Sequence, residues 1–288
     1  MQISVSSYSF SQYTNHGKLS MKELIGKAKE MGFDGIEYTN ILDWDGHTPE
    51  ENAAILREEA ERVGIPIIHY TIGADFLCAK GADYMAEQLF REVDICEILG
   101  AKALRHDVTT GFPKEKRAYL SYDQAIEIAA PAIRKVTEYA ASKGISTSTE
   151  NHGRFSQDAE RVASLIGAVG HPNFGALVDI GNFVCADEDP LHAVGILAPM
   201  AKHVHAKDFH VKSGNAASPG EGFFRSRGGN YLMGCNVGHG DVPVYQCLGI
   251  LKREGYDGYI SVEYEGNEDT FRGVRISKDN IARYWAQA

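Results

Sequence analysis

The sequence predicts a single (β/α)8 barrel, and three observations support this fold class. Short apolar runs that end in polar residues alternate with longer helical patterns about eight times in 288 residues, which is typical of parallel strands joined by helices. The first run is not followed by the glycine-rich phosphate turn or the Walker lysine that often marks an open, nucleotide-binding sheet. No linker rich in Pro, Gly or Ser divides the chain, so residues 1–288 are expected to form one domain.

The eight expected strands are short and end in polar residues. They span residues 3–10, 35–39, 65–71, 103–108, 145–151, 174–181, 202–209 and 258–265. The helical segment 20–32 opens with Ser20 three residues before Glu23, as in a capping box, and ends at Gly32; the segment 129–144 also ends on a glycine. Residues 211–240 form a long irregular stretch, which we expect to lie as a loop over the C-terminal mouth of the barrel.

Composition and charge disfavour several classes of function. A formal net charge of -10, from 29 basic and 39 acidic residues, argues against nonspecific binding to nucleic acid, which requires many phosphate contacts. The five cysteines are odd in number and contain no C-x-x-C pair, so neither a disulfide framework nor a structural zinc site is indicated. No secretion signal and no membrane-spanning run is visible. We therefore expect a cytoplasmic protein that acts on small molecules, away from membranes.

The alternation of side chains along each strand predicts which residues point into the barrel. The polar face of the expected strands carries Glu37, His69, His106, Ser146, Ser148, Glu150, His152, Asp179, His203, His205, Lys207, Ser261 and Glu263. Apolar neighbours such as Val178, Val204 and Val262 then face the helices. Because the carboxyl ends of barrel strands meet at one mouth, these polar residues are predicted to converge on one site.

Four of these residues form a candidate metal site. Glu150, Asp179, His205 and Glu263 offer three carboxylates and one imidazole, a set that suits one divalent ion, Mn²⁺ first and Mg²⁺, Co²⁺ or Zn²⁺ next. The structural alternative is that Lys207 or Arg105 neutralises the carboxylates as plain ion pairs. The metal is favoured because burying three carboxylates without a cation costs several kcal/mol each.

Short motifs at the strand ends resemble those of a known family. "TEN" at 149–151, "DIGN" at 179–182, "HAKD" at 205–208, "VEYEG" at 262–266, "GFDGIE" at 32–37 and "GHGDVP" at 238–243 look like motifs of the xylose-isomerase-like TIM barrels, the sugar phosphate isomerase/epimerase superfamily. The resemblance covers essentially the whole chain. It implies that the four residues above are the metal ligands of the ketose 3-epimerase branch, with Glu150 and Glu263 also its acid/base pair. The oligomeric state is left open by the sequence, although relatives often form dimers or tetramers, so a homo-oligomer is one of the alternatives.

The resemblance has one departure, at Asn182. Many relatives in the epimerase branch carry at this position a histidine that commonly contacts the substrate. Other branches of the superfamily include inosose dehydratases, dehydroshikimate dehydratases, hydroxypyruvate isomerases and endonuclease IV. A shared fold therefore leaves the reaction open among them.

The site chemistry predicts proton abstraction next to a carbonyl. A metal open to two substrate oxygens would stabilise an enediolate, while Glu150 and Glu263 take and return a proton. We predict a metal-dependent isomerase or epimerase of carbohydrate metabolism, acting on a small sugar, polyol or keto-sugar. The alternative is a lyase or dehydratase that eliminates from a keto-sugar, keto-glycoside or inosose. A carbohydrate-binding barrel without activity and an endonuclease IV-like nuclease are less favoured, because of the glutamate pair and the acidic charge, respectively.

Further residues are predicted to contact the substrate, each with a plainer alternative. They are His152, Lys207, Asn182, His69, His106, Arg227 and Trp44. His152 also suits a hydrogen bond to a neighbouring loop, and Lys207 suits an ion pair with Glu150 or Asp179. Arg227, in a glycine-rich loop, suits a carboxylate or phosphate, although arginines in such loops are more often solvated. Trp44 suits stacking on a sugar ring or packing of its loop onto the barrel.

Overall fold

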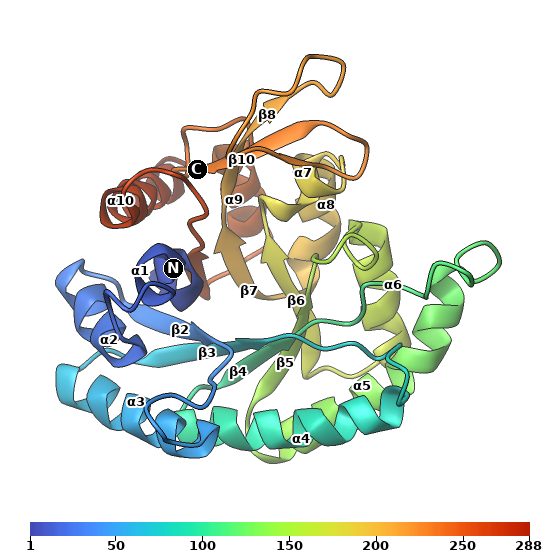
Figure 1. The fold of residues 1–288 in the computed structure, drawn as a ribbon, viewed down its shortest axis with the longest axis horizontal. Helices are drawn as coiled ribbons and strands as arrows, with labels where there is room; N and C mark the ends of the chain where they lie inside the picture. The colour runs from blue at the N-terminus through green and yellow to red at the C-terminus, as the bar shows by residue number, and fades with distance from the viewer.

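Eight parallel strands close into a barrel in the order β1-β11-β7-β6-β5-β4-β3-β2 (Figure 1). The structure is a computed structural model and describes residues 1–288. The barrel strands are β1 Gln2–Ser6, β2 Gly35–Thr39, β3 Ile67–Ile72, β4 Ala103–His106, β5 Ser146–Glu150, β6 Phe174–Asp179, β7 Ala201–Ala206 and β11 Tyr259–Val262. Every neighbouring pair is parallel. The (β/α)8 fold class predicted from the sequence is confirmed.

Helices surround the barrel on its outer side (Figure 1). The long ones are α2 Met21–Glu30, α3 Pro49–Val63, α4 Ala82–Leu99, α5 Tyr122–Ser142, α6 Ala159–Val169, α8 Pro190–Leu197, α9 Val244–Arg253 and α10 Thr270–Gln287; the short ones are α1 Ser11–Thr14, α7 Asn182–Cys185 and the 3-10 turns η1 Ser7–Phe10 and η2 Ala198–Met200. Ser20 and Glu23 form the predicted capping box of α2. None of the helices combines the length and the apolar character needed to cross a membrane.

The main apolar core lies between the strands and the helices. Val178, Val204 and Val262 are fully buried in it, as the strand alternation predicts. Leu24 and Ile25 of α2 and Leu248 and Leu251 of α9 belong to the same cluster. Because the apolar faces of the strands pack against the helices, the opposite faces point into the barrel, where they can carry polar groups.

The stretch 211–240 is only partly irregular: residues 213–223, 226–230 and 236–240 form loops and turns as predicted, but the segments between them are strands. The chain leaves the barrel at Lys207 and forms a small antiparallel sheet of β8 Asp208–Lys212, β10 Tyr231–Cys235 and β9 Phe224–Arg225. This sheet stands at the rim, beyond the carboxyl end of β7 (Figure 1). Because only one residue separates β7 from β8, the sequence pattern shows a single strand where the structure has two.

One buried carboxylate fastens the rim sheet to the turn that follows it. Asp208, which is 1% exposed, accepts hydrogen bonds from the N–H groups of Phe209, Gly238, Gly240 and Val242 at 2.8, 2.8, 2.9 and 3.1 Å. A Cβ atom on Gly240 would collide with this carboxylate. Backbone amides that are withdrawn from water need such an acceptor, so Asp208 determines the path of the "GHGD" turn.

Replacing Asp208 by alanine tests this role. We expect Asp208→Ala to lower the free energy of unfolding by about 3 kcal/mol, because several buried amides lose their acceptor at once. Asp241→Ala is the matched control, since the Asp241 carboxylate accepts from the exposed N–H of Val211, and it should cost less than about 1 kcal/mol. Urea unfolding of both variants measures the difference, and equal losses would contradict the assignment.

Candidate metal centre

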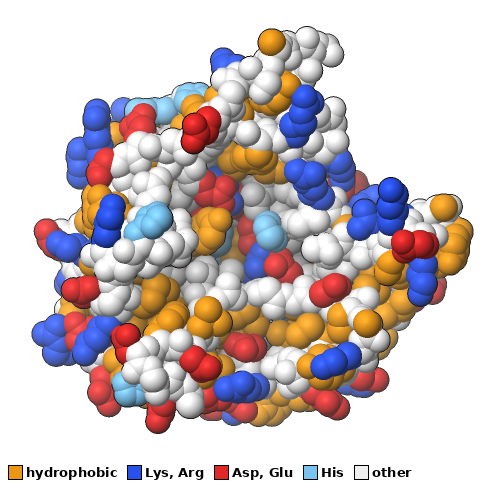
Figure 2. Space-filling model, in the orientation of Figure 1, with side chains coloured by type: hydrophobic (Ala, Val, Ile, Leu, Met, Phe, Trp, Pro, Cys, Tyr) orange, Lys and Arg blue, Asp and Glu red, His pale blue; other side chains and the backbone are white.

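The structure brings the four predicted ligands together at the carboxyl ends of four strands. Glu150 and Asp179 end β5 and β6, His205 is the penultimate residue of β7, and Glu263 directly follows β11. One donor atom of each lies within 4.8 Å of the others, and all four residues are buried. They are up to 113 positions apart in sequence. Figure 2 shows a hollow in the middle of this face, in which acidic, basic and histidine side chains are visible.

Two of the donor atoms make no hydrogen bond within the protein. Asp179 Oδ1 accepts from the N–H groups of Gly181 and Asn182, at 2.8 and 3.0 Å, whereas Oδ2 accepts none, although the Lys207 ammonium lies 3.2 Å away. His205 Nδ1 is also without a hydrogen bond; it lies 3.4 Å from Glu263 Oε1 and 3.9 Å from Asp179 Oδ2. Buried polar atoms normally have partners, so these two atoms fit a role as cation ligands.

The predicted ion pairs exist beside the candidate ligands. Arg105 Nη2 lies 2.7 Å from Glu150 Oε2, and Lys207 Nζ lies 2.6 Å from Glu263 Oε2. Burial would raise the pKa of the Glu263 carboxyl, but Lys207 and His205 outweigh it and hold that pKa well below its usual value. The structural alternative considered for the sequence is therefore partly right.

These ion pairs do not balance the charge of the site. Four carboxylates inside the barrel are less than a tenth exposed, those of Glu37, Glu150, Asp179 and Glu263, and two equally buried cations, Arg105 and Lys207, lie among them. Glu37 and Glu263 outweigh burial and raise the pKa of His205 well above its usual value, and even with His205 positively charged one negative charge remains. Burial raises the pKa of Asp179 to about 7 against the opposing charge of Lys207. One divalent cation would offset this excess, because an opposite charge favours the ionised form of each carboxyl.

Asn182 holds two groups of the site together. As the first residue of α7, it donates from Nδ2 to Glu150 Oε1 at 2.7 Å and accepts from Lys207 Nζ at 3.2 Å. The amide thus fixes the carboxylate and the ammonium relative to each other. A substrate contact of Asn182 stays a prediction, while its two protein contacts follow directly from the geometry.

His152 and Lys207 lie at the mouth in different environments. The His152 side chain is 51% exposed, and its Nδ1 lies 3.0 Å from Asp107 Oδ1, which is the loop hydrogen bond considered as its alternative role. That hydrogen bond raises the pKa of His152. Asp107 in turn lies 2.7 Å from Arg105 Nη2. Lys207 is only 4% exposed and contacts three carboxylates, those of Glu263, Asp179 and Glu265.

His69 points into the barrel as predicted, whereas His106 does not. His69 is 1% exposed and stacks on His203, with ring centroids 4.4 Å apart. His106 packs against Phe76 and Phe174 on the outer side of the barrel, with centroids 5.6 and 5.8 Å away. The prediction that His106 binds the substrate is therefore wrong.

The error at His106 comes from the phase of strand β4. Leu104 shares the face of His106, and its neighbour Thr147 on β5 bonds to Thr137 of α5, which identifies this face as the outer one. Arg105 is then the inward residue. The run "RHD" is polar on both faces, so the alternation rule could not fix its phase. Only the apolar Leu104 indicates which face of β4 is the outer one, because its side chain packs against the helices.

Arg227 and Trp44 lie in rim segments with contacts of their own. The Arg227 guanidinium donates to both oxygens of Asp158, at 2.8 and 2.5 Å, and to the carbonyl of Ala186 at 2.9 Å. These contacts tie the loop before β10 to the loops after β5 and α7, so this guanidinium is engaged by protein groups instead of being free for a substrate. Trp44 is partly buried in a turn with His47 and packs against the core cluster.

The family assignment rests on the whole chain. The chain belongs to the xylose isomerase-like TIM barrel family, because a model of that family matches residues 25–284. This confirms the resemblance seen in the strand-end motifs.

Individual relatives include enzymes of different kinds. The sequence is similar to inosose dehydratase of Bacillus anthracis (strain CDC 684 / NRRL 3495), 22% identical over 256 residues that cover 85% of this chain and 82% of that protein. The fold is similar to the IOLI protein with a binding zinc atom, at a TM-score of 0.76 and 14% identity, over 100% and 99% of the two chains. It is also similar to D-psicose 3-epimerase in the presence of D-fructose, at a TM-score of 0.72 and 15% identity, over 99% of each chain. Identities this low for the solved structures establish the fold alone.

The outward position of His106 gives a testable pH dependence. Burial lowers the pKa of His106 to about 4, whereas an unfolded chain binds this proton at about pH 6.5. The unfolded state therefore holds more protons between these values, and the free energy of unfolding falls as the pH drops from about 6.5 to about 4. We expect His106→Phe to flatten this slope by up to about 1.4 kcal/mol per pH unit. Urea unfolding across this range checks it; an unchanged slope would contradict the assignment.

Proposed function

We propose that the chain is a divalent-metal-dependent enzyme that removes a proton next to the carbonyl of a small sugar, polyol-derived ketone or keto-sugar. Glu150, Asp179, His205 and Glu263 would hold the ion, with Mn²⁺ proposed ahead of Mg²⁺, Co²⁺ and Zn²⁺. The observation that carries the proposal is the grouping of three carboxylates and one imidazole within 4.8 Å, at a buried site with excess negative charge. The enzyme names of the relatives support it.

The glutamates differ in how the protein holds them. A bound divalent ion would polarise the substrate carbonyl and lower the energy of the negative charge that develops on it. Lys207 and His205 hold the pKa of Glu263 well below its usual value, so Glu263 meets the substrate in the unprotonated form that a base requires. Glu150 is fixed by Arg105 and Asn182, one partner on each oxygen. Lys207 Nζ lies beside Glu263 and is placed to hold a substrate oxygen.

Epimerisation or isomerisation is the first form of this reaction. Glu263 would take the proton from one face of the substrate, and Glu150, after taking up a proton from solvent or a substrate hydroxyl, would deliver it from the other face, which inverts the carbon. If the proton returns to the adjacent carbon instead, an aldose and a ketose are interconverted. Epimerisation needs an acid/base group on each face of the substrate, whereas one such group is enough for the isomerisation; Glu150 and Glu263 are both within the group of four.

Dehydration is the second candidate, and two observations favour it. The similarity to inosose dehydratase covers 85% of the chain. His152 stands half-exposed at the mouth, where its hydrogen bond to Asp107 raises its pKa. A protonated imidazole at this place suits donation to a departing hydroxyl. In this form the proton taken by a glutamate is not returned, and water leaves from the neighbouring carbon.

Metal content tests the site itself. We expect about one Mn, Mg, Co or Zn ion per chain in protein purified without chelator, and loss of the ion in His205→Ala, because an imidazole ligand is removed. His106→Phe is the matched control, since it changes a buried histidine outside the site and should retain the ion. Elemental analysis measures all three proteins. A wild type without metal, even after the ions are added back, would make the four residues a structural ion network.

Solvent-deuterium exchange tests the chemistry. In deuterated water with metal present, we expect ketoses or inososes to incorporate deuterium next to the carbonyl, and Glu263→Gln to slow this exchange by at least about 100-fold, as loss of a general base does. Glu188→Gln is the control, because Glu188 is partly buried and accepts from the N–H of Ala159. Mass spectrometry separates epimerisation, which retains the substrate mass apart from deuterium, from loss of water. Full exchange in Glu263→Gln would remove that residue from the acid/base role.

A further inference from the structure

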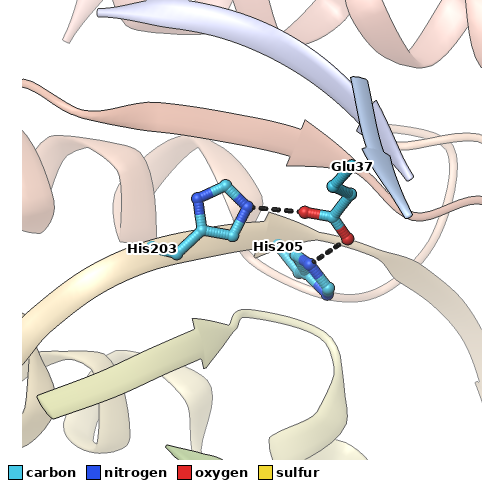
Figure 3. Close-up of side chains that lie close together, drawn as sticks. All are labelled: Glu37, His203 and His205. Carbon is cyan, nitrogen blue, oxygen red and sulfur yellow. Dashed lines mark hydrogen bonds and ion pairs between the residues drawn. The ribbon is translucent and has the colours of Figure 1, made fainter. Parts of the chain in front are cut away.

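Glu37 lies inside the barrel between two histidines of β7 and is outside the group of four (Figure 3). Its Oε1 lies 2.8 Å from His205 Nε2, and its Oε2 lies 2.7 Å from His203 Nε2. The contact with His205 has the distance of an ion pair without the geometry of a hydrogen bond, and neither of its two atoms has a hydrogen-bond partner elsewhere. Glu37 and His205 are both fully buried, so water cannot replace either partner.

This contact determines which nitrogen of His205 carries a proton. An ionised carboxylate only accepts hydrogen bonds, so His205 Nε2 has to be the protonated nitrogen. In a neutral ring the lone pair is then on Nδ1, the atom that lies 3.4 Å from Glu263 Oε1 and 3.9 Å from Asp179 Oδ2. The nitrogen suited to a metal therefore faces the other ligands, and it does so because Glu37 engages the opposite side of the ring.

Several donors hold Glu37 itself in place. Ser261 Oγ donates to Glu37 Oε2 at 2.9 Å and lies 2.6 Å from Ser4 Oγ. The ring of His203 is in turn stacked on that of His69. His203 Nε2 and Ser261 Oγ both donate to Oε2 of Glu37, and a carboxylate that accepts such hydrogen bonds is favoured in its ionised form. These contacts also hold the Glu37 side chain in place.

The charge of Glu37 has no permanent counter-ion. Only His203 and His205 lie within ion-pair distance of its carboxylate, and no lysine or arginine does. A fully buried carboxylate without a positive partner is costly. Positive charge has to reach Glu37 through an imidazole, either as a proton on the ring or as a cation bound to the far nitrogen of His205. Glu37 and a cation at the group of four would therefore stabilise each other across one ring.

We propose that Glu37 is a positioning residue, which fixes His205 with Nδ1 toward the ligand group and raises the affinity of that group for a divalent cation. This inference rests on the proposed function, because it requires that the four residues bind a metal. Carboxylates that accept from the far nitrogen of a ligand histidine typically contribute 10- to 100-fold to metal affinity. The sequence offered Glu37 as one inward polar residue among many, without this role.

Metal titration of matched variants tests the proposal. We expect Glu37→Gln to bind Mn²⁺ and Zn²⁺ about 10- to 100-fold more weakly than the wild type in calorimetric titrations. Glu92→Gln is the control, because Glu92 accepts from the Tyr70 hydroxyl at 2.8 Å and has no contact with the four ligands; its affinity should equal that of the wild type. Glu37→Asp retains the charge on a shorter side chain and should fall between the two.

The histidine resonances supply a readout that a purely structural role would not change. We expect the Nε2–H of His205 to give a slowly exchanging imidazole resonance in wild-type protein labelled with ¹⁵N-histidine and loaded with Zn²⁺, identified by its absence in His205→Asn. In Glu37→Gln this resonance should shift and exchange faster, since a neutral amide replaces the carboxylate. An unprotonated Nε2 in the wild type would overturn the proposal.

The outcomes separate the two proposals. If the wild type binds no divalent ion, the proposed function fails, and the inference about Glu37 fails with it. If the wild type binds metal and Glu37→Gln binds it within about 3-fold of the wild type, the inference alone fails. Should Glu37→Gln not fold, Ser261→Ala removes one of the donors to Glu37 and is expected to weaken binding by about 3-fold; unchanged affinity in Ser261→Ala together with an unprotonated His205 Nε2 would overturn the inference.

Discussion

An excess of buried negative charge at the barrel mouth is the constraint on which the rest of the structure depends. Glu37, Glu150, Asp179 and Glu263 are withdrawn from water, and each needs a partner to stay ionised. The side chains of Arg105 and Lys207 point into the barrel, and their two positive charges balance two of the four negative ones. Each of them contacts more than one carboxylate. The remaining negative charge would favour a bound cation, which supports the proposed metal site independently of any resemblance to other proteins.

The rim of the barrel is fastened mainly by carboxylates. Asp208 collects the amides of the "GHGD" turn, Asp158 pairs with Arg227, and Asp187 accepts from Ser226 Oγ at 2.6 Å and from Asn230 Nδ2 at 2.8 Å. These contacts link the small sheet to the loops after β5 and α7. A rim fixed in this way keeps the candidate ligands and the polar groups around them in one arrangement before a substrate arrives, which reduces the entropy lost on binding.

The same constellation is compatible with more than one reaction. Removal of a proton next to a carbonyl is common to epimerisation, isomerisation and dehydration, and the reactions diverge only in what receives or supplies the next proton. In this chain Asn182 stands where a histidine is common among epimerases, and it binds Glu150 and Lys207. His152, which we propose as a proton donor in the dehydration, stands half-exposed at the mouth. The choice among reactions therefore depends on groups around the metal site and not on the barrel.

The sequence by itself determined the barrel and the four candidate ligands. Strand alternation is a local property, and where one face is purely apolar, as at Val178, Val204 and Val262, it assigns the opposite face to the barrel interior without ambiguity. Only the tertiary structure decided the direction of side chains on strands that are polar on both faces, and the contacts between residues of distant strands. β4 is polar on both faces, so only packing showed that Arg105 points inward and His106 outward. Glu37 and His205 come from strands that are not neighbours in the barrel, β2 and β7, so their contact depends on barrel closure. The ion pairs of Lys207 and Arg227 depend in the same way on distances across the mouth, which no spacing along the chain encodes.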